Sequence, residues 1–223
     1  MPILKKIISG LLSLIDLAIV PFNITPMDQF EKAVDDCDSI LDLGCGHSSG
    51  IRYLKKRKKY TVGVDLSEEC IRISRERNIH DENFVLDILD IEKKIKPKSF
   101  DCVILLEVIE HLTKNEGLQI IKKMEKIATK KIVVTTPNGF LPQDEYDENI
   151  YQFHKSGWKT KDFKKLNFKV YGFNGLKFIR GDYAKVKLKP IELWTRISLF
   201  SNFFVKFFPQ LAFNLLCVKE LKA

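Results

Sequence analysis

The sequence predicts an α/β protein of one domain, built on an open and mostly parallel sheet. Its 223 residues are enough for one hydrophobic core and leave little room for a second. Apolar, β-branched runs alternate along the chain with stretches of helical periodicity, which indicates βαβ units. Some of these runs, such as residues 102–106, are apolar throughout, as is typical of parallel strands covered on both faces.

Between residues 39 and 136 the chain is predicted to form five strands with helices between them. The strands are expected at residues 39–43, 61–65, 83–86, 100–106 and 131–136. The helices are expected at residues 49–58, 68–77 and 115–128. Two further strands are expected after Pro137, at residues 168–171 and 212–220, with a long insertion between them.

Two amphipathic helices are predicted outside this alternating pattern. The first precedes the sheet, and its apolar face carries Leu4, Ile7, Ile8, Leu11, Leu12 and Ile15. The second lies in the insertion, where Pro190 is expected to start a helix and Pro209 to stop it. We therefore expect an N-terminal helical cap over residues 1–30, one domain over residues 31–223, and an insertion or lid at about residues 175–210.

The net charge, the cysteines and the length of the apolar stretches indicate the environment in which the protein works. The net charge is +8, and from Tyr151 onward fifteen basic side chains stand against four acidic ones. Such a surface faces lipid headgroups, nucleic acid or only solvent. The five cysteines form no CxxC pair, and no apolar stretch reaches the roughly 20 residues that span a bilayer. We expect a cytoplasmic protein that is neither exported nor membrane-spanning.

A glycine turn after the first predicted strand indicates a nucleotide-like ligand. Gly44 and Gly46 allow a tight turn and close approach of the backbone to a ligand. Asp65, at the tip of the next strand, is placed to bind ribose hydroxyls. Asp42 favours S-adenosylmethionine over a dinucleotide, because a carboxylate there would repel a pyrophosphate and attract an ammonium and a sulfonium.

Several ordered motifs make the chain resemble the class I S-adenosylmethionine-dependent methyltransferases. They follow that family's order and spacing over residues 39–138, and the two late strands extend the resemblance to about residue 220. The motifs are Leu41-Asp-Leu-Gly-Cys-Gly46, Val62-Gly-Val-Asp-Leu-Ser67, Phe84-Val-Leu-Asp87, the run from Phe100 to Leu112, and Val134-Thr-Thr-Pro-Asn138. The resemblance implies a Rossmann-like sheet of seven strands, with the last strand antiparallel to the rest.

The resemblance also implies which residues contact the cofactor, S-adenosylmethionine. They are Asp42, Gly44, Gly46, Asp65, Leu66, Asp87, Ile88 and Glu107. By position, the first three surround the methionine end, Asp65 holds the ribose, and Asp87 with Ile88 meets the adenine. Glu107 closes the site near the methionine moiety. Asp87 also has a purely structural interpretation, as a turn residue at the end of a strand.

The segment from Glu107 to His111 is a candidate half-site for a metal. If a helical turn begins there, Glu107, Glu110 and His111 share one face at positions i, i+3 and i+4. Two carboxylates and an imidazole suit Mg²⁺ or Mn²⁺, and His154 is a fourth candidate ligand. The arrangement resembles that of metal-assisted 2′-O-methyltransferases of small RNA ends, and ubiquinone-pathway O-methyltransferases carry a similar segment.

The same residues also have an interpretation without a metal. In many members of the family the glutamate meets the cofactor and the histidine shapes the pocket. His154 and His111 are then the catalytic candidates, with His154 as a general base because histidine titrates close to neutral pH. A histidine that only satisfies backbone groups is the structural alternative.

The insertion bears on the methyl acceptor, because a basic stretch in it precedes an aromatic one. The basic residues are Lys177, Arg180, Lys185, Lys187 and Lys189, and the aromatic ones are Trp194, Phe200, Phe203, Phe204, Phe207 and Phe208. This pattern is typical of a membrane-surface segment, so we expect an amphiphilic acceptor and peripheral membrane contact. A soluble small molecule under a helical lid, RNA bound through phosphates and base stacking, and a non-catalytic scaffold are the alternatives.

Overall fold

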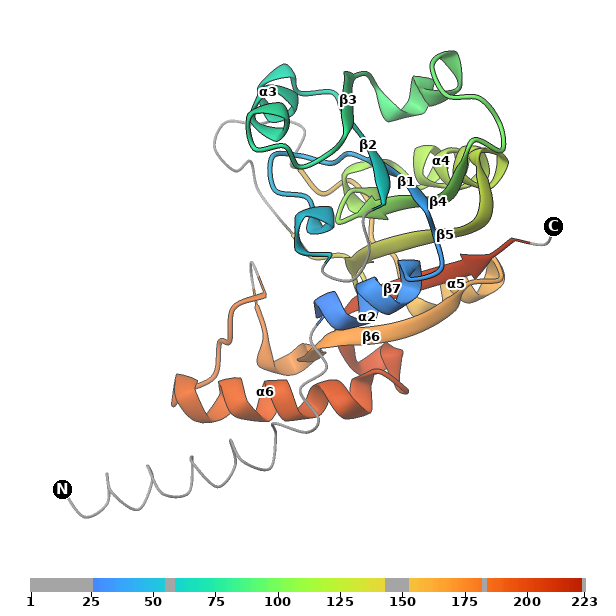
Figure 1. Ribbon diagram of the computed structural model, residues 1–223. Helices are drawn as coiled ribbons and strands as arrows, with labels where there is room; N and C mark the ends of the chain where they lie inside the picture. The colour runs from blue at the N-terminus through green and yellow to red at the C-terminus, as the bar shows by residue number, and fades with distance from the viewer. Residues whose placement is uncertain (1–25, 55–58, 143–152, 182–183, 222–223) are drawn as a thin grey trace.

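Seven strands form one twisted sheet in the computed structural model, which describes residues 26–54, 59–142, 153–181 and 184–221 (Figure 1). The strands are β1 (Ser39–Leu43), β2 (Tyr60–Asp65), β3 (Glu82–Val85), β4 (Phe100–Leu106), β5 (Ala128–Pro137), β6 (Lys169–Leu176) and β7 (Ala212–Glu220). Their order across the sheet is β3-β2-β1-β4-β5-β7-β6. The first five strands are parallel, and β7 runs antiparallel to both of its neighbours.

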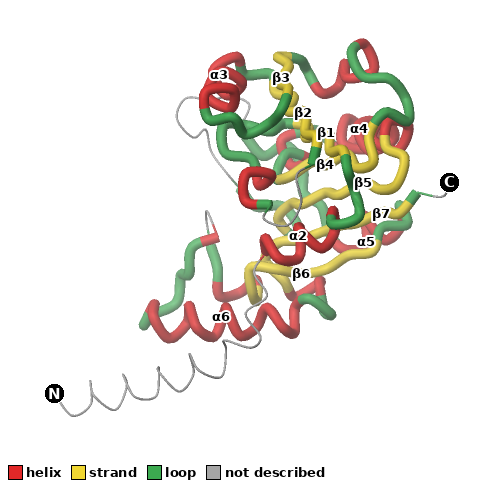
Figure 2. The backbone as a smooth tube through the Cα atoms, in the orientation of Figure 1, coloured by secondary structure: helices red, strands yellow, loops and turns green. Residues whose placement is uncertain are grey.

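Helices cover both faces of this sheet (Figures 1 and 2). The α-helices are α2 (Pro26–Val34), α3 (Glu68–Glu76), α4 (Lys114–Ile127), α5 (Thr160–Lys165) and α6 (Ile191–Val205). Short 3-10 helices are η2 (Gly50–Tyr53), η3 (Ile88–Lys93), η4 (Ile109–His111), η6 (Lys177–Ile179) and η8 (Pro209–Leu211). No helix within the described ranges is long and apolar enough to cross a membrane.

The alternation of side chains along the strands builds two cores. Leu41 and Leu43 of β1 point to the face that packs with α4, whereas Ile40 points to the face that packs with α2. The central parallel strands β1, β4 and β5 are thus buried on both sides, as their apolar runs predict. The predicted α/β class with an antiparallel last strand is confirmed.

The structure bears differently on three of the predicted helices. The helix predicted at residues 49–58 is wrong in its described part, which is the single turn η2 followed by an extended Leu54. The insertion helix is confirmed as α6, directly after Pro190. The N-terminal amphipathic helix falls on residues 1–25, which lie outside the described ranges, so the cap over residues 1–30 stays a prediction.

A close contact between α4 and Trp158 holds the segment that follows β5. Trp158 is 1% exposed, and its Nε1 donates a hydrogen bond of 2.9 Å to Ser156 Oγ. Its ring lies directly on Gly117 of α4, so a Cβ at Gly117 would overlap it. The backbone N–H of Ser156 donates 3.0 Å to the carbonyl of Glu110, which fixes the nearby His154 against η4.

Replacing Gly117 with alanine is expected to destabilise the protein. Overlap with the indole ring costs about 1–3 kcal/mol and the higher helix propensity of alanine returns about 1 kcal/mol, so a net loss of about 1 kcal/mol is expected, and at most about 2 kcal/mol. Urea denaturation should show a lower midpoint with an unchanged slope. Lys122→Ala, on the exposed face of α4, is the matched control. A Gly117→Ala variant as stable as the wild type would contradict the tight contact.

Candidate active site

The glycine turn after β1 places its two glycines in different surroundings. Gly44 and Gly46 both have positive φ angles, 69° and 56°, which favour glycine. A Cβ on Gly44 would approach Cγ2 of Val108 to 2.6 Å, so this glycine is needed for packing. A Cβ on Gly46 would meet no atom within 4 Å, so this glycine borders open space. The turn therefore offers bare backbone to a ligand at Gly46.

Asp65 holds the turn from the end of β2. Its Oδ2 accepts a hydrogen bond of 2.8 Å from the N–H of Gly46, and its Oδ1 accepts one of 2.9 Å from the N–H of Ser67. Each carboxylate oxygen has a second acceptor position, so Asp65 can still accept from two hydroxyl groups. Leu66, 43% exposed, lies beside it. These residues lie next to the β1–β4 boundary, where the strand order reverses and ligands bind in such sheets.

Asp42 is buried beneath the turn instead of facing open space. It is 1% exposed, and its Oδ2 accepts from the hydroxyl of Ser49 and lies 3.1 Å from Nε2 of His80. Nδ1 of the same imidazole lies 3.1 Å from Ser74 Oγ. A side chain on Gly63 would fill this space, since its Cβ would come within 2.7 Å of the imidazole. Nothing in the sequence spacing predicts this network, which supports the turn from below.

Asp87 and Ile88 follow the end of β3. Oδ1 of Asp87 accepts 2.8 Å from the N–H of Leu89, so this residue caps the short helix η3. Ile88 is 7% exposed and packs in the core, so it can reach a ligand only through its backbone. The contacts of Asp87 are thus those expected of a turn residue at the end of a strand. Its contact with adenine stays a prediction.

A cavity of about 390 Å³ opens where β4, β5, β6 and β7 meet the segment after β5. Its wall is mostly apolar and includes Met27, Phe30, Leu106, Phe173, Phe213 and Leu216. Its polar groups are concentrated in Glu107, Glu110, His111, His154 and Asn214. An apolar cavity with a few convergent polar groups is the usual form of a small-molecule site.

Glu107 lines this cavity directly after β4, in a conformation that the sequence does not reveal. Its φ is 55°, a left-handed value that is uncommon for a residue other than glycine. Its N–H donates 3.1 Å to the carbonyl of Thr135, and its Oε2 accepts 3.0 Å from Asn214 Nδ2. Solvent reaches the side chain through the cavity. The carboxyl is nevertheless densely surrounded by protein, and the resulting desolvation raises its pKa to about 7.

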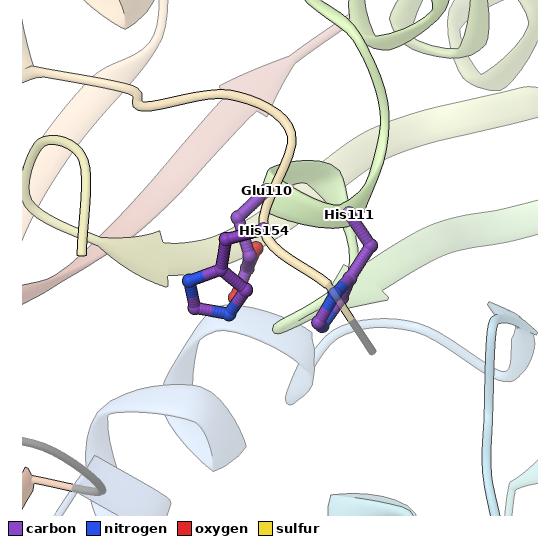
Figure 3. A group of neighbouring side chains, drawn as sticks. All are labelled: Glu110, His111 and His154. Carbon is purple, nitrogen blue, oxygen red and sulfur yellow. The ribbon is translucent and has the colours of Figure 1, made fainter. Parts of the chain in front are cut away.

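Glu110, His111 and His154 form a cluster at the same cavity (Figure 3). One ligand atom of each residue lies within 4.8 Å of the others. Nδ1 of His154 lies 2.6 Å from the carbonyl of Leu141, and Nδ1 of His111 lies 3.3 Å from the carbonyl of Phe153. Because a carbonyl only accepts, Nδ1 carries the proton in each neutral ring and Nε2 keeps its lone pair. Backbone orientation of this kind is common for metal-binding histidines.

The carboxyl of Glu110 lacks a cationic partner among the described residues. Glu110 is 3% exposed, and its Oε2 accepts a hydrogen bond of 3.0 Å from Thr136 Oγ1. Burial raises its pKa well above the usual value, and the nearby charge of Glu107 raises it further. Burial also lowers the pKa of His154, which keeps that imidazole neutral. A buried carboxyl beside a second one stays protonated unless a bound ligand brings positive charge.

The predicted metal set is thus only partly brought together. The helical turn after β4 is just η4, and Glu107 lies outside it in a left-handed conformation, so the expected i, i+3, i+4 face does not form. Glu107 does not belong to the converging group, whereas Glu110, His111 and His154 do. The donors that remain are one carboxylate and two imidazoles.

Comparisons with known proteins agree on the fold. Residues 41–133 match the family model described as a methyltransferase domain. An uncharacterized protein of Methanocaldococcus jannaschii is 27% identical over 163 residues, which cover 71% of this chain and 69% of that protein.

Two solved structures resemble the chain over most of its length. A S-adenosylmethionine-dependent methyltransferase from Archaeoglobus fulgidus aligns with a TM-score of 0.58 at 17% identity, covering 92% of this chain and 94% of that one. The methyltransferase domain of bacterial CtHen1-C aligns with a TM-score of 0.56 at 18% identity, covering 88% and 97%. Residues 41–133 thus resemble a methyltransferase domain, and the chain shares the fold of these two solved structures.

Proposed function

We propose that this methyltransferase transfers a methyl group from S-adenosylmethionine to a hydroxyl oxygen of a small, largely apolar acceptor, with help from a divalent cation. The observation that carries the proposal is the cluster of Glu110, His111 and His154 at the apolar cavity. Glu107 lies at the same cavity and follows β4, next to the glycine turn after β1. The glycine turn, which would bind the cofactor, and the cavity, which would bind the acceptor, would thus meet at Glu107.

The residues of the turn fit the cofactor that the domain implies. Gly46 leaves open space at its Cα, and Asp65 retains acceptor capacity for two ribose hydroxyls. Glu107, with no ion pair among the described side chains, would face the ammonium of the methionine moiety. Bound S-adenosylmethionine supplies an electrophilic methyl group on a sulfonium, so the protein needs chiefly to align the acceptor. The strained backbone of Glu107 is consistent with such a positioning role.

The three converging donors fit a transition-metal ion better than Mg²⁺. Two imidazole nitrogens and one carboxylate oxygen suit Mn²⁺, Fe²⁺, Co²⁺ or Zn²⁺, whereas Mg²⁺ prefers oxygen ligands. Bonds of about 2.1 Å to a tetrahedral or octahedral ion place neighbouring donors about 3.0–3.4 Å apart, so donors up to 4.8 Å apart would have to move closer by about 1 Å or more on binding. We therefore propose Mn²⁺ or a similar ion in place of the expected Mg²⁺. Such an ion lowers the pKa of a hydroxyl that it contacts.

The cavity wall supports a small acceptor with an apolar body. Mostly apolar side chains line a volume of about 390 Å³, within the usual range for small-molecule sites. The resemblance of the Glu-x-x-Glu-His segment to ubiquinone-pathway O-methyltransferases supports a phenol or catechol. Its resemblance to small-RNA 2′-O-methyltransferases makes the ribose of an RNA end the alternative acceptor.

Methyl transfer in defined metal conditions tests this proposal. The full chain is freed of metal with EDTA and supplied with methyl-labelled S-adenosylmethionine and a panel of alkyl phenols, catechols and short RNAs. We expect transfer to a phenol or catechol that requires added Mn²⁺ or Co²⁺ and is weak with Mg²⁺ alone. Glu110→Gln should lower the rate by about 100-fold or more. Glu76→Gln, an exposed carboxylate on α3, is the matched control.

Two results would contradict the metal part of the proposal. Full transfer in EDTA, with Glu110→Gln as active as the wild type, would exclude a role for the ion. If His154→Ala alone then abolished transfer, Nε2 of His154 would be the general base instead. Mn²⁺-dependent transfer to RNA alone would replace the small acceptor with a ribose hydroxyl.

A further inference from the structure

Helix α6 turns its polar side chains toward the protein and its aromatic side chains outward. Its buried positions include Ser198, Ser201 and Asn202, which are 0%, 4% and 4% exposed. The exposed side chains of the helix and the turn after it include Phe200, Phe203, Phe204, Phe207 and Phe208, here called the aromatic face. A surface helix normally has the opposite arrangement. The exposed phenylalanines therefore indicate that an apolar partner binds the outer side of the helix.

The inward face of α6 is polar because it completes the hydrogen bonds of the edge strand β6. Asn202 Oδ1 accepts 2.7 Å from the N–H of Gly175, and Ser201 Oγ accepts 3.0 Å from the N–H of Leu176. The helix lies so close that a Cβ on Gly175 would overlap Ser198. These contacts fix the rotation of α6, so the phenylalanines cannot turn inward while the contacts persist.

The aromatic face is continuous. The ring centroids of Phe200 and Phe204 are 5.5 Å apart, as are those of Phe203 and Phe204, and those of Phe203 and Phe207 are 6.0 Å apart. Phe207 is 65% exposed and Phe208 is 53% exposed. A contiguous apolar surface of this kind marks an interaction site. Figures 1 and 2 show α6 at the margin of the molecule, far from α3 and α4.

Basic residues lie at both ends of this helix. Lys185, Lys187 and Lys189 are exposed in the segment that leads into α6. At the other end, Nζ of Lys206 lies 5.7 Å from the ring centroid of Phe207. Over residues 177–208 the sequence has seven basic side chains and two acidic ones. The partner of the aromatic face is therefore expected to carry negative charge around an apolar interior.

We propose that the aromatic face binds the surface of an anionic lipid bilayer, with α6 lying in the plane of the membrane. Phenylalanines at the acyl boundary supply apolar burial, and lysines at the helix ends meet anionic headgroups. β6, on which α6 packs, also carries Phe173 of the cavity wall, so the helix that bears the aromatic face lies next to a strand of the acceptor cavity. From this placement we expect the methyl acceptor to be amphiphilic, an expectation that rests on the proposed function.

Vesicle sedimentation with the full chain tests the proposal. We expect binding to phosphatidylcholine vesicles with about a quarter phosphatidylglycerol, little binding to phosphatidylcholine alone, and weakening by salt. Phe204→Ser/Phe207→Ser should lower the partition coefficient at least about tenfold. Lys187→Glu/Lys189→Glu should lower it for the anionic vesicles alone. Leu118→Ser, a 36% exposed leucine on α4, is the matched control and should bind as the wild type does.

Three outcomes would overturn the proposal. The full chain could fail to bind anionic vesicles, or the double phenylalanine variant could bind as well as the wild type, which would assign binding to another segment such as residues 1–25. Sedimentation velocity could instead show a dimer that the double variant loses, which would make a second copy the partner. S-adenosylmethionine affinity, measured in parallel, should be equal in all variants and separates this proposal from the failure of the proposed function.

Discussion

Asp65→Ala is expected to weaken the binding of S-adenosylmethionine by about 100-fold. The carboxylate would accept hydrogen bonds from two ribose hydroxyls, and hydrogen bonds to a charged group contribute about 1.5–3 kcal/mol each. The change also removes the bond from the N–H of Gly46, which holds the glycine turn. Calorimetric titration of the full chain measures the dissociation constant directly.

Two further variants separate ligand binding from support of the turn. Asp65→Asn keeps the size of the side chain and one acceptor oxygen, so its loss should lie between those of the alanine variant and the wild type. Glu76→Gln on α3 should titrate as the wild type does. Unchanged cofactor affinity in Asp65→Ala, with circular dichroism showing a folded protein, would contradict the placement of the ribose.

Glu110→Gln is expected to lower the affinity for Mn²⁺ by about 100-fold or more, since it replaces the only carboxylate among the three converging donors. The amide retains the size of the side chain and the hydrogen bond with Thr136. Electron paramagnetic resonance of added Mn²⁺, which separates free from bound ion, measures the change. His154→Ala should show a similar loss.

The melting temperature of the protein provides a second test of Mn²⁺ binding at Glu110. A ligand present at about 100 times its dissociation constant stabilises the folded protein by about 2.7 kcal/mol, so Mn²⁺ should raise the melting temperature of the wild type by several degrees. Glu110→Gln should show no such rise, and without metal it should be at least as stable as the wild type because a buried carboxylate is gone. Equal Mn²⁺ stabilisation of both proteins would contradict the cluster as the site.

The strands of the parallel sheet are predictable from sequence because each contains a short run of apolar or β-branched residues. β1 and β4 have the predicted bounds, and β5 extends three residues before and one residue after its prediction. The helix expected at residues 49–58 is wrong in its described part, because Ser49 caps a single turn by accepting from the N–H of Ile51, after which Leu54 is extended. A local side-chain hydrogen bond there outweighs helical periodicity.

The candidate site is predictable where it depends on chain position, and not where it depends on contacts across the fold. The glycine turn and Asp65 follow from spacing along βαβ units. The partnership of Asp42 with His80 joins residues 38 positions apart, and no local pattern encodes it. The left-handed φ of Glu107 likewise has no signal in a non-glycine residue, although it decides that this carboxylate stays out of the donor cluster.

Helix α6 shows why an amphipathic pattern does not fix the direction in which a helix faces. The spacing of Phe200, Phe204 and Phe207 is compatible with a stripe that packs on the core. The structure instead buries Ser198 and Asn202, because β6 is an edge strand whose N–H groups need acceptors. The apolar stripe is left exposed, which is the basis for the proposed membrane contact.

Anomalous scattering from crystals grown with S-adenosylhomocysteine and Mn²⁺ tests the central claim most directly, since it shows both ligands at once. One strong anomalous peak is expected about 2.1 Å from Nε2 of His111, Nε2 of His154 and a carboxylate oxygen of Glu110. The ribose of the ligand is expected on Asp65. An anomalous map without a peak at these three residues, or a ligand bound away from the glycine turn, would contradict the claim.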